Sequence, residues 1–231
     1  LEEKKEIVSE AAATRGRMKL LVGCGSCSLA ETLQLVAFST RKQADAVLVP
    51  PPFYYRNVSL RGIEEYFDAV LDAAELPVLL YHIPSHTGIP LDRGTLTRLS
   101  SRPRLWGIKD SGGKLSDTSR FLAAPPGRVL LGADTQILSG LKLGTQGVIS
   151  ACANVLPREV SGIWKMYRAG ENAEPFQTTV AALREKLRQV PIYAAMKFLL
   201  RERGIDCGGV RLPLGQLTSE QEESMRQMMP H

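Results

Sequence analysis

The sequence lacks the features that define several large classes of protein. None of the apolar runs in its 231 residues approaches the roughly 18 residues that a membrane-spanning helix requires, so we predict no membrane span. The net charge is +5, but the basic residues are scattered and form no dense block with interleaved aromatic residues. This pattern disfavours nucleic-acid binding and suits a solvated surface that meets a small anionic substrate.

Metal-ligating residues are also scarce, with four cysteines and three histidines in the whole chain. Cys24 and Cys27 form a CxxC pair, but there is no second such pair and no nearby pair of histidines, as a zinc site would require. A dithiol redox site usually opens a helix in a different local sequence. We therefore predict neither a metal site nor a redox site, and we interpret the pair as the glycine-flanked end of a strand.

No glycine- or serine-rich linker, low-complexity stretch or charge block divides the chain. The sequence starts at Leu1 rather than at a methionine, inside a pattern that is typical of an amphipathic helix. No signal or transit peptide is visible. We expect a cytoplasmic or mitochondrial protein, with the choice between these compartments left open.

Six short apolar runs alternate with amphipathic segments. Each run has the length of a buried strand and is nearly continuous in apolar character, which is typical of parallel strands covered on both faces. The dinucleotide-binding fingerprint GxGxxG is incomplete in GCGSCS, whereas the runs end in polar residues, as strands around a barrel mouth do. We therefore favour an α/β fold of the (β/α)8 barrel type over a doubly wound sheet. The runs cover residues 18–25, 45–55, 76–84, 104–112, 128–134 and 147–154.

The pattern becomes purely helical after residue 155. We predict that residues 1–155 form a partial (β/α) barrel and that residues 156–231 form the last barrel helix and a C-terminal helical extension. Pro191 is expected at the first position of its helix, where a missing N–H costs nothing. The four helical segments are 156–170, 171–190, 191–204 and 218–229.

A lysine, Lys109, stands at the end of the fourth apolar run, in the segment WGIKDSGG. Apolar surroundings favour the neutral form of an amine, and a neutral amine attacks a ketone to form a Schiff base. The alternative is a structural lysine that forms an ion pair with Asp110 or Asp134. Position alone does not decide between these two interpretations.

Tyrosines at the ends of the preceding runs favour the interpretation of Lys109 as a nucleophile. Tyr81 ends the third run, and adjacent parallel strands lie about 4.8 Å apart, so Tyr81 and Lys109 can face each other. A tyrosine beside an amine or iminium group can move protons to and from a substrate hydroxyl. Tyr54 adds a polar aromatic from the second run. One tyrosine alone would indicate a core or rim residue, but tyrosine and lysine on successive strand ends predict a catalytic pair.

Several segments, in this order, resemble the dihydrodipicolinate synthase / N-acetylneuraminate lyase family. They are PPFYY, YHIPSHTG, GIKDSGG, the run 132–154 and, near the end, GGVRLPL. The resemblance covers essentially the whole chain and implies a class I, pyruvate-handling aldolase on a TIM barrel. It implies that Lys109 forms the Schiff base, that Tyr81 relays protons and positions the substrate, and that Tyr54 completes the relay, often across a tight dimer interface.

The same resemblance implies further contacts around the lysine. Ile149 lies where the family uses a backbone carbonyl near the Schiff base, and Gly132 and Asp134 would line the mouth of the barrel. His86, in YHIPSHTG, is a departure from the pattern. Members that condense pyruvate with aspartate semialdehyde usually carry an arginine there, and a neutral histidine cannot make the same bidentate contact with a carboxylate. The resemblance is therefore greatest to the branch that cleaves 4-hydroxy-2-oxoglutarate or 2-oxo-3-deoxy sugar acids, with His86 either at the substrate site or on the rim without a role.

A second departure concerns the first two strands of the family. The second of them ends in a Gly-Thr-Thr-Gly-Glu-like motif that holds the pyruvate carboxylate, and this sequence has no counterpart of it. Six strands cannot close an eight-stranded barrel of the usual geometry. We therefore expect a TIM (β/α)8 barrel that lacks its first two strands in the given chain.

The Lys109–Tyr81 pair and the resemblance together predict a Schiff-base aldolase that cleaves a 4-hydroxy-2-oxo acid to two products: pyruvate or another 2-oxo acid, and glyoxylate or another aldehyde. No metal or organic cofactor is expected, because the lysine itself supplies the electron sink. We expect pyruvate as the small-molecule partner and a homodimer or homotetramer as the assembly. Two alternatives remain: dihydrodipicolinate synthase itself, and a truncated, non-catalytic paralogue that acts as a binding or oligomer-forming protein.

Overall fold

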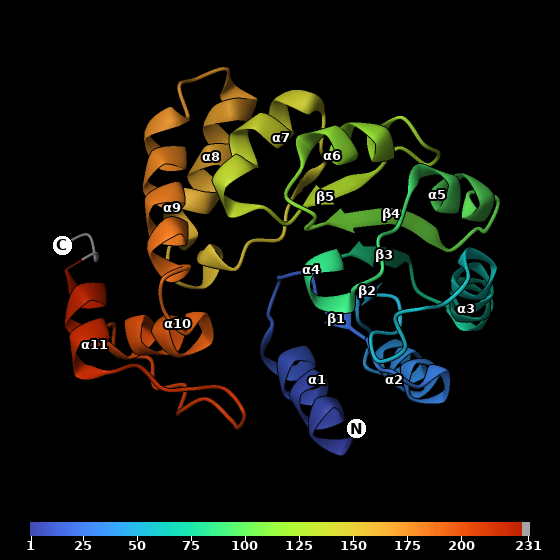
Figure 1. The fold of residues 1–231 in the computed structure, drawn as a ribbon, viewed down its shortest axis with the longest axis horizontal. Helices are drawn as coiled ribbons and strands as arrows, with labels where there is room; N and C mark the ends of the chain where they lie inside the picture. Colours follow the sequence, from blue (N-terminus) through green and yellow to red (C-terminus); the bar gives the residue numbers. More distant parts are fainter. Residues whose placement is uncertain (228–231) are drawn as a thin grey trace. The chain divides into compact units, whose positions relative to one another are not determined.

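The structure, a computed structural model, describes residues 1–227, which divide into two compact units (Figure 1). Unit 1 consists of Leu1–Gly132 and Leu143–Gly147, and unit 2 consists of Ala133–Lys142 and the chain from Val148 onward. The chain first passes from unit 1 to unit 2 after Gly132. There the short helix η1 (Asp134–Gln136) packs against a C-terminal helix, α9 (Glu174–Leu187).

Six parallel strands form one sheet, and their order in the sheet follows the chain from β1 to β6. Each strand lies inside one of the six predicted apolar runs, so the prediction of an α/β fold with six strands is confirmed. The strands are shorter than the runs, because the ends of each run form loops. The strands are β1 (Leu21–Gly23), β2 (Ala46–Val49), β3 (Val78–His82), β4 (Leu105–Asp110), β5 (Val129–Leu131) and β6 (Gly147–Val148).

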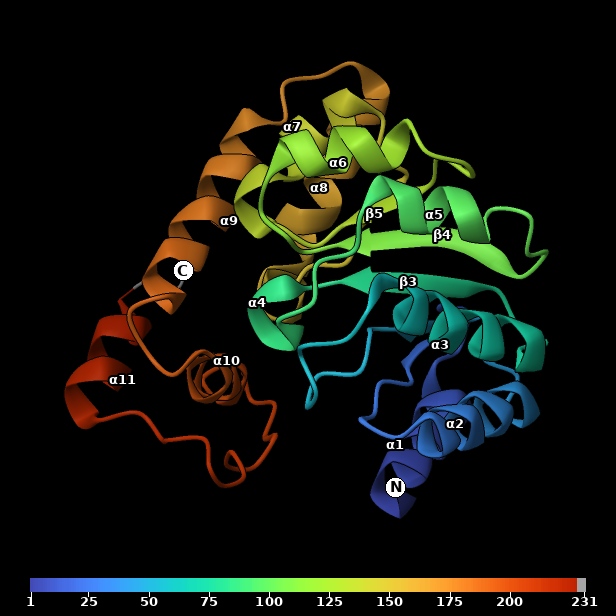
Figure 2. The same cartoon turned by 45° about the vertical axis from the view of Figure 1, so that its right-hand side comes forward.

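Helices of unit 1 lie side by side along one face of this sheet (Figures 1 and 2). Neighbouring helices are in contact in the order α1, α2, α3, α5 and α6. Three of them begin where a side-chain oxygen accepts a backbone N–H of the first turn, from Ser28, Ser59 and Asp92. The helices are α1 (Glu2–Thr14), α2 (Leu29–Arg41), α3 (Leu60–Ala73), α4 (Pro84–Thr87), α5 (Arg93–Leu99) and α6 (Leu115–Leu122).

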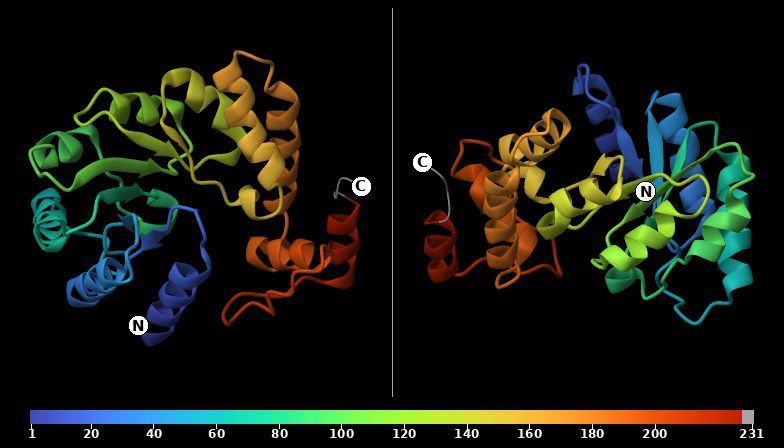
Figure 3. Two further views of the ribbon diagram at one scale, coloured as in Figure 1. Left: turned by 180° about the vertical axis from the view of Figure 1, so that it is seen from behind. Right: turned by 90° about the horizontal axis from the view of Figure 1, so that it is seen from above.

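Unit 2 is helical, and α8 and α9 pack side by side in it (Figure 3). The four helices predicted after residue 155 are all present, although residues 228 and 229 of the last predicted segment lie outside the described residues. Pro191 is the residue before its helix rather than the first helical residue. The elements are α7 (Ile137–Leu143), which ends in unit 1, η2 (Cys152–Asn154), α8 (Pro157–Ala169), α9 (Glu174–Leu187), α10 (Ile192–Arg201) and α11 (Ser219–Arg226).

Each unit has a hydrophobic core of its own. In unit 1 the strand residues Val47, Val78 and Ile108 are completely buried, together with Phe67 of α3. In unit 2 the core joins α7, α8, α9 and α10. Among residues 1–227, no helix is long and apolar enough to cross a membrane.

Candidate active site

The candidate site begins with the register of two neighbouring strands. In the parallel pair β3 and β4, Tyr81 lies opposite Lys109, and His82 lies opposite Asp110. Lys109 Nζ donates a hydrogen bond to Tyr81 Oη at 3.1 Å and lies 4.2 Å from the centre of the tyrosine ring. Only 9% of the Lys109 surface is exposed. The two residues that the sequence predicts as a catalytic pair therefore contact each other.

The carboxylate next to Lys109 has other partners. Successive strand residues point to opposite faces of a sheet, so Asp110 faces away from the lysine side chain. Its Oδ1 accepts the backbone N–H of Gly112 at 2.9 Å, and its Oδ2 accepts the hydroxyl of Thr118 at 2.6 Å. Within unit 1, no ion pair involves Lys109. The structure therefore contains no ion pair between Lys109 and Asp110.

Two other predicted residues of unit 1 lie on the surface. Tyr54 is 74% exposed, and its ring contacts that of Tyr55 edge to face at 5.0 Å. No hydrogen bond or ring contact within residues 1–227 joins Tyr54 to Tyr81 or Lys109. His86 is exposed on α4, where its Nδ1 shares a hydrogen bond of 2.9 Å with the hydroxyl of Ser85. The structure does not bring either residue into contact with the Lys109–Tyr81 pair.

Gly132 follows β5 and packs closely against the segment after Lys109. Its N–H donates to the carbonyl of Asp110 at 2.7 Å. A Cβ atom at Gly132 would lie 1.9 Å from Ser111 Oγ and 3.2 Å from the Asp110 carbonyl oxygen. A methyl group at this position would therefore crowd the segment that follows Lys109.

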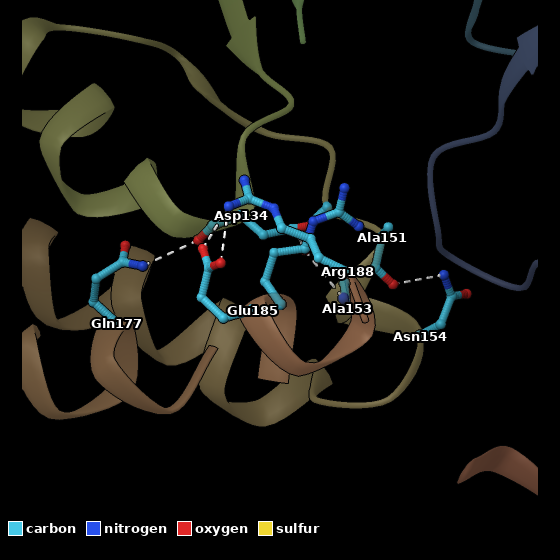
Figure 4. Close-up of polar contacts among 9 residues, drawn as sticks. Asp134, Ala151, Ala153, Asn154, Gln177, Glu185 and Arg188 are labelled. Carbon is cyan, nitrogen blue, oxygen red and sulfur yellow. Dashed lines mark hydrogen bonds and ion pairs between the residues drawn. The ribbon is translucent and has the colours of Figure 1, made fainter. Parts of the chain in front are cut away.

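Asp134 is the centre of a polar cluster in unit 2 (Figure 4). Its side chain is 2% exposed; the Ser150 hydroxyl donates to Oδ1, and Arg184 Nε lies 3.7 Å from Oδ2. The side-chain amide of Gln177 donates to the Asp134 backbone carbonyl at 3.0 Å. The carboxylate therefore joins α9 to the 147–154 segment. Ile149, which comes directly before Ser150 in this segment, is half-buried. No local motif in the sequence points to Arg184 or Gln177, because both lie on α9, about 40 to 50 positions after Asp134.

The cysteines of the CxxC pair differ in their surroundings. Cys24 is buried, and burial raises the pKa of its thiol to about 11, whereas Cys27 is exposed. In unit 2, burial and the nearby Asp134 carboxylate raise the pKa of the Cys152 thiol to about 12. No group of three or more histidine, cysteine, aspartate or glutamate side chains in the described part of the chain is arranged to hold a metal ion.

Comparison with known proteins identifies the family. The sequence model of the dihydrodipicolinate synthetase family matches residues 1–231. The chain belongs to the dihydrodipicolinate synthetase family. It is 34% identical over 238 aligned positions to 4-hydroxy-tetrahydrodipicolinate synthase of Listeria innocua, and the alignment covers 99% of this chain and 80% of that protein.

Solved structures agree with this membership. The 4-hydroxy-tetrahydrodipicolinate synthase of Methylacidiphilum fumariolicum SolV superposes with a TM-score of 0.91 at 31% identity, over 98% of this chain and 77% of that one. YagE of Escherichia coli K12, a family member solved in complex with pyruvate, superposes with a TM-score of 0.92 at 27% identity. The superposition covers 98% of this chain and 80% of YagE. The six-stranded sheet is thus part of a TIM-barrel-like α/β fold. The chain is accordingly a lyase-type enzyme of the dihydrodipicolinate synthetase family, a family of class I enzymes in which a lysine forms a Schiff base.

Proposed function

We propose that this member of the dihydrodipicolinate synthetase family cleaves 4-hydroxy-2-oxo acids, of the 4-hydroxy-2-oxoglutarate or 2-oxo-3-deoxy sugar acid type. The observation that carries this proposal is the hydrogen bond of 3.1 Å between Lys109 Nζ and Tyr81 Oη. It places a buried primary amine beside a hydroxyl group that can exchange protons with a bound substrate.

The proposed reaction uses both groups in turn. The amine of Lys109 adds to the 2-oxo carbon, and the resulting carbinolamine loses water to give an iminium ion. Tyr81 Oη, having given its proton to the hydroxyl that leaves the carbinolamine, accepts the proton of the 4-hydroxyl group while the bond between C3 and C4 breaks. The electron pair of that bond forms the C2=C3 double bond of an enamine while the π electrons of the iminium group move to its nitrogen, and C4 leaves as an aldehyde. Protonation of the enamine and hydrolysis of the imine then release the 2-oxo acid and restore the lysine.

His86 supports cleavage over synthesis from aspartate semialdehyde. It is exposed and shares a hydrogen bond with Ser85, and a neutral imidazole offers a carboxylate at most one N–H. An arginine offers a bidentate pair of donors, which is the stronger way to hold a second carboxylate. The alternative, 4-hydroxy-tetrahydrodipicolinate synthesis, is favoured by the name of the Listeria innocua relative mentioned above.

Other parts of the proposal extend the resemblance described above. Tyr54 is assigned to the proton relay and Ile149, Gly132, Asp134 and His86 to substrate contacts. The exposed rings of Tyr54 and Tyr55 suit a homo-oligomeric interface, as a dimer or tetramer, because exposed aromatic pairs commonly mark protein–protein contacts.

We further propose that β1 to β6 correspond to the last six strands of an eight-stranded barrel, with α9, α10 and α11 as the helical extension. The relatives named above support this correspondence, since the chain covers about 80% of their length. Those relatives come from bacteria and support the cytoplasmic alternative rather than the mitochondrial one.

Borohydride trapping tests the proposed nucleophile. Pyruvate and borohydride should produce a covalent adduct on the peptide that contains Lys109, detected by mass spectrometry. Lys109→Arg should abolish the adduct, and the exposed Lys165→Arg should retain it. An adduct elsewhere, or none with the wild-type chain, would refute the assignment and favour the non-catalytic alternative.

Kinetics then separate the two enzymatic hypotheses. Release of pyruvate from 4-hydroxy-2-oxoglutarate, or from a 2-oxo-3-deoxy sugar acid, supports the cleavage proposal. Condensation of pyruvate with aspartate semialdehyde as the faster reaction would contradict it. Tyr81→Phe should keep the borohydride adduct but lower kcat about 10²- to 10³-fold, since it removes proton transfer and not the amine.

A further inference from the structure

A pocket lies in unit 1, on the face of the sheet opposite to the Lys109–Tyr81 pair. Its volume is about 410 Å³, within the range of small-molecule sites. Its lining includes His82 of β3, Phe121 of α6, and Leu91 and Arg93 at the start of α5. His82 is next to Tyr81 in a strand whose successive side chains point to opposite faces, so this pocket, the His82 pocket, is separate from the site proposed for catalysis.

His82 presents a hydrogen-bond donor to this pocket. It is 3% exposed, and its Nδ1 accepts the backbone N–H of Leu91 at 3.1 Å. A neutral imidazole that accepts through Nδ1 carries its proton on Nε2. Burial lowers the pKa of His82, which favours this neutral form even though Asp110 and Asp117 oppose the shift. Within residues 1–227, Nε2 has no hydrogen-bond partner.

A glycine keeps the space in front of this donor open. A Cβ atom at Gly112, which also lines the pocket, would lie 2.7 Å from His82 Nε2. No positive φ angle explains glycine at this position, because Gly112 is absent from the residues with left-handed backbone. The lack of a side chain therefore leaves Nε2 accessible from the pocket.

The charged groups that line the pocket leave an excess of free cations. Asp92 accepts hydrogen bonds at the start of α5, at 2.7 Å from a backbone N–H, and Asp117 pairs with Arg120 at 3.2 Å. Arg93 and Lys114 are exposed, and neither forms an ion pair or a side-chain hydrogen bond with the described residues. The acids of the pocket are thus occupied, whereas two cations and one buried N–H are available to a ligand.

We propose that the His82 pocket binds a small organic dicarboxylate. One carboxylate accepts the Nε2–H of His82 in the interior, and the other meets Arg93 and Lys114 at the opening. Phe121 and Leu91 provide apolar surface for the carbon chain between the two carboxylates. A buried polar group gains most when its unused hydrogen bond is completed, and a charged acceptor makes the stronger bond.

Histidine-ring NMR tests this proposal directly. The chain has three histidines, and H86Q and H231Q variants identify two of the ring signals, which leaves the third as that of His82. Glutarate is titrated into the protein with pyruvate present in excess, so that the Lys109 site is occupied. We expect a saturable shift of the His82 Nε2 signal, with an affinity in the millimolar range or tighter.

Charge variants provide the matched comparison. R93Q and K114Q should each weaken glutarate binding about tenfold, since each removes one charge-assisted contact, whereas the exposed R17Q should leave it unchanged. Glutaramide, the neutral diamide, should not bind. The proposal is overturned if glutarate leaves the His82 signal in place, if the R93Q/K114Q double variant binds equally well, or if inorganic phosphate binds as tightly. The K109R variant should bind glutarate normally, so the result does not depend on the proposed reaction.

Discussion

Gly132→Ala is the sharpest test of how the site is built. Gly132 follows β5, and its missing side chain leaves room for Ser111, two positions after Lys109. In the variant, the new Cβ would lie 1.9 Å from Ser111 Oγ, 3.0 Å from Ser111 Cβ and 3.2 Å from the Asp110 carbonyl oxygen. Rotation of the serine hydroxyl can relieve the first contact. The other two involve atoms that move only with the backbone.

The expected cost follows from these contacts. Overpacking in a filled site costs about 1–3 kcal/mol, and the loss of glycine flexibility in the unfolded chain returns about 0.4–1 kcal/mol. We therefore expect Gly132→Ala to lower the free energy of unfolding of unit 1 by about 1–2 kcal/mol. Ser111→Ala should recover part of this loss, with a coupling free energy of at least about 0.5 kcal/mol in a double-mutant cycle.

Urea unfolding followed by tryptophan fluorescence measures this effect. Trp106 lies on β4 in unit 1 and Trp164 on α8 in unit 2, so a Trp164→Phe background reports on unit 1 alone. Gly23→Ala is the matched control, because Gly23 is the last residue of β1 and a Cβ atom there would meet nothing within 4 Å. The control should be neutral or slightly stabilised. If Gly132→Ala unfolds at the same urea concentration as this control, the packing argument is refuted.

Two further predictions concern buried titratable groups. Ellman's reagent at pH 8 should modify two thiols in the native chain and four in denaturant, because burial protects Cys24 and Cys152. Rapid reaction of all four thiols in the native chain would contradict the structure. Burial also lowers the pKa of the His82 imidazole from its ordinary value of 6.5. The unfolded chain therefore binds a proton at His82 more readily than the folded chain does. As a result, the free energy of unfolding should fall as the pH drops below about 6.5. H82Q should flatten this dependence and H86Q, at an exposed position, should not; the reverse result would exclude His82 as its source.

Much of the fold could be predicted from the sequence, because buried parallel strands and amphipathic helices leave different patterns. The six apolar runs each contain a strand, and the four helical segments predicted after residue 155 each contain a helix. The division into units was not predictable in the same way. It depends on η1 packing against α9, a contact between segments about 40 residues apart that no local pattern encodes.

The candidate site was predictable where strand geometry determines it. Tyr81 and Lys109 end successive parallel strands, and the register of β3 and β4 places them opposite each other. Tyr54 shows the limit of that reasoning, since it lies in a loop beyond β2 and is largely exposed. Asp134 has a well-defined set of partners, but they include Arg184, whose position follows from how α9 packs.

The alternation of side chains in β4 explains why Lys109 and Asp110 can be adjacent without neutralising each other. The carboxylate lies on the helix side of the sheet, where the Gly112 N–H and the Thr118 hydroxyl complete its hydrogen bonds. The amine lies on the other face, with the hydroxyl and ring of Tyr81. Breaking a buried ion pair by removing one partner from it costs about 3–5 kcal/mol. Lys109 has no such pair within unit 1, so the attack on a carbonyl carbon proposed above does not require its nitrogen to give up a carboxylate first. Asp110 meanwhile holds the turn that follows Lys109 in place.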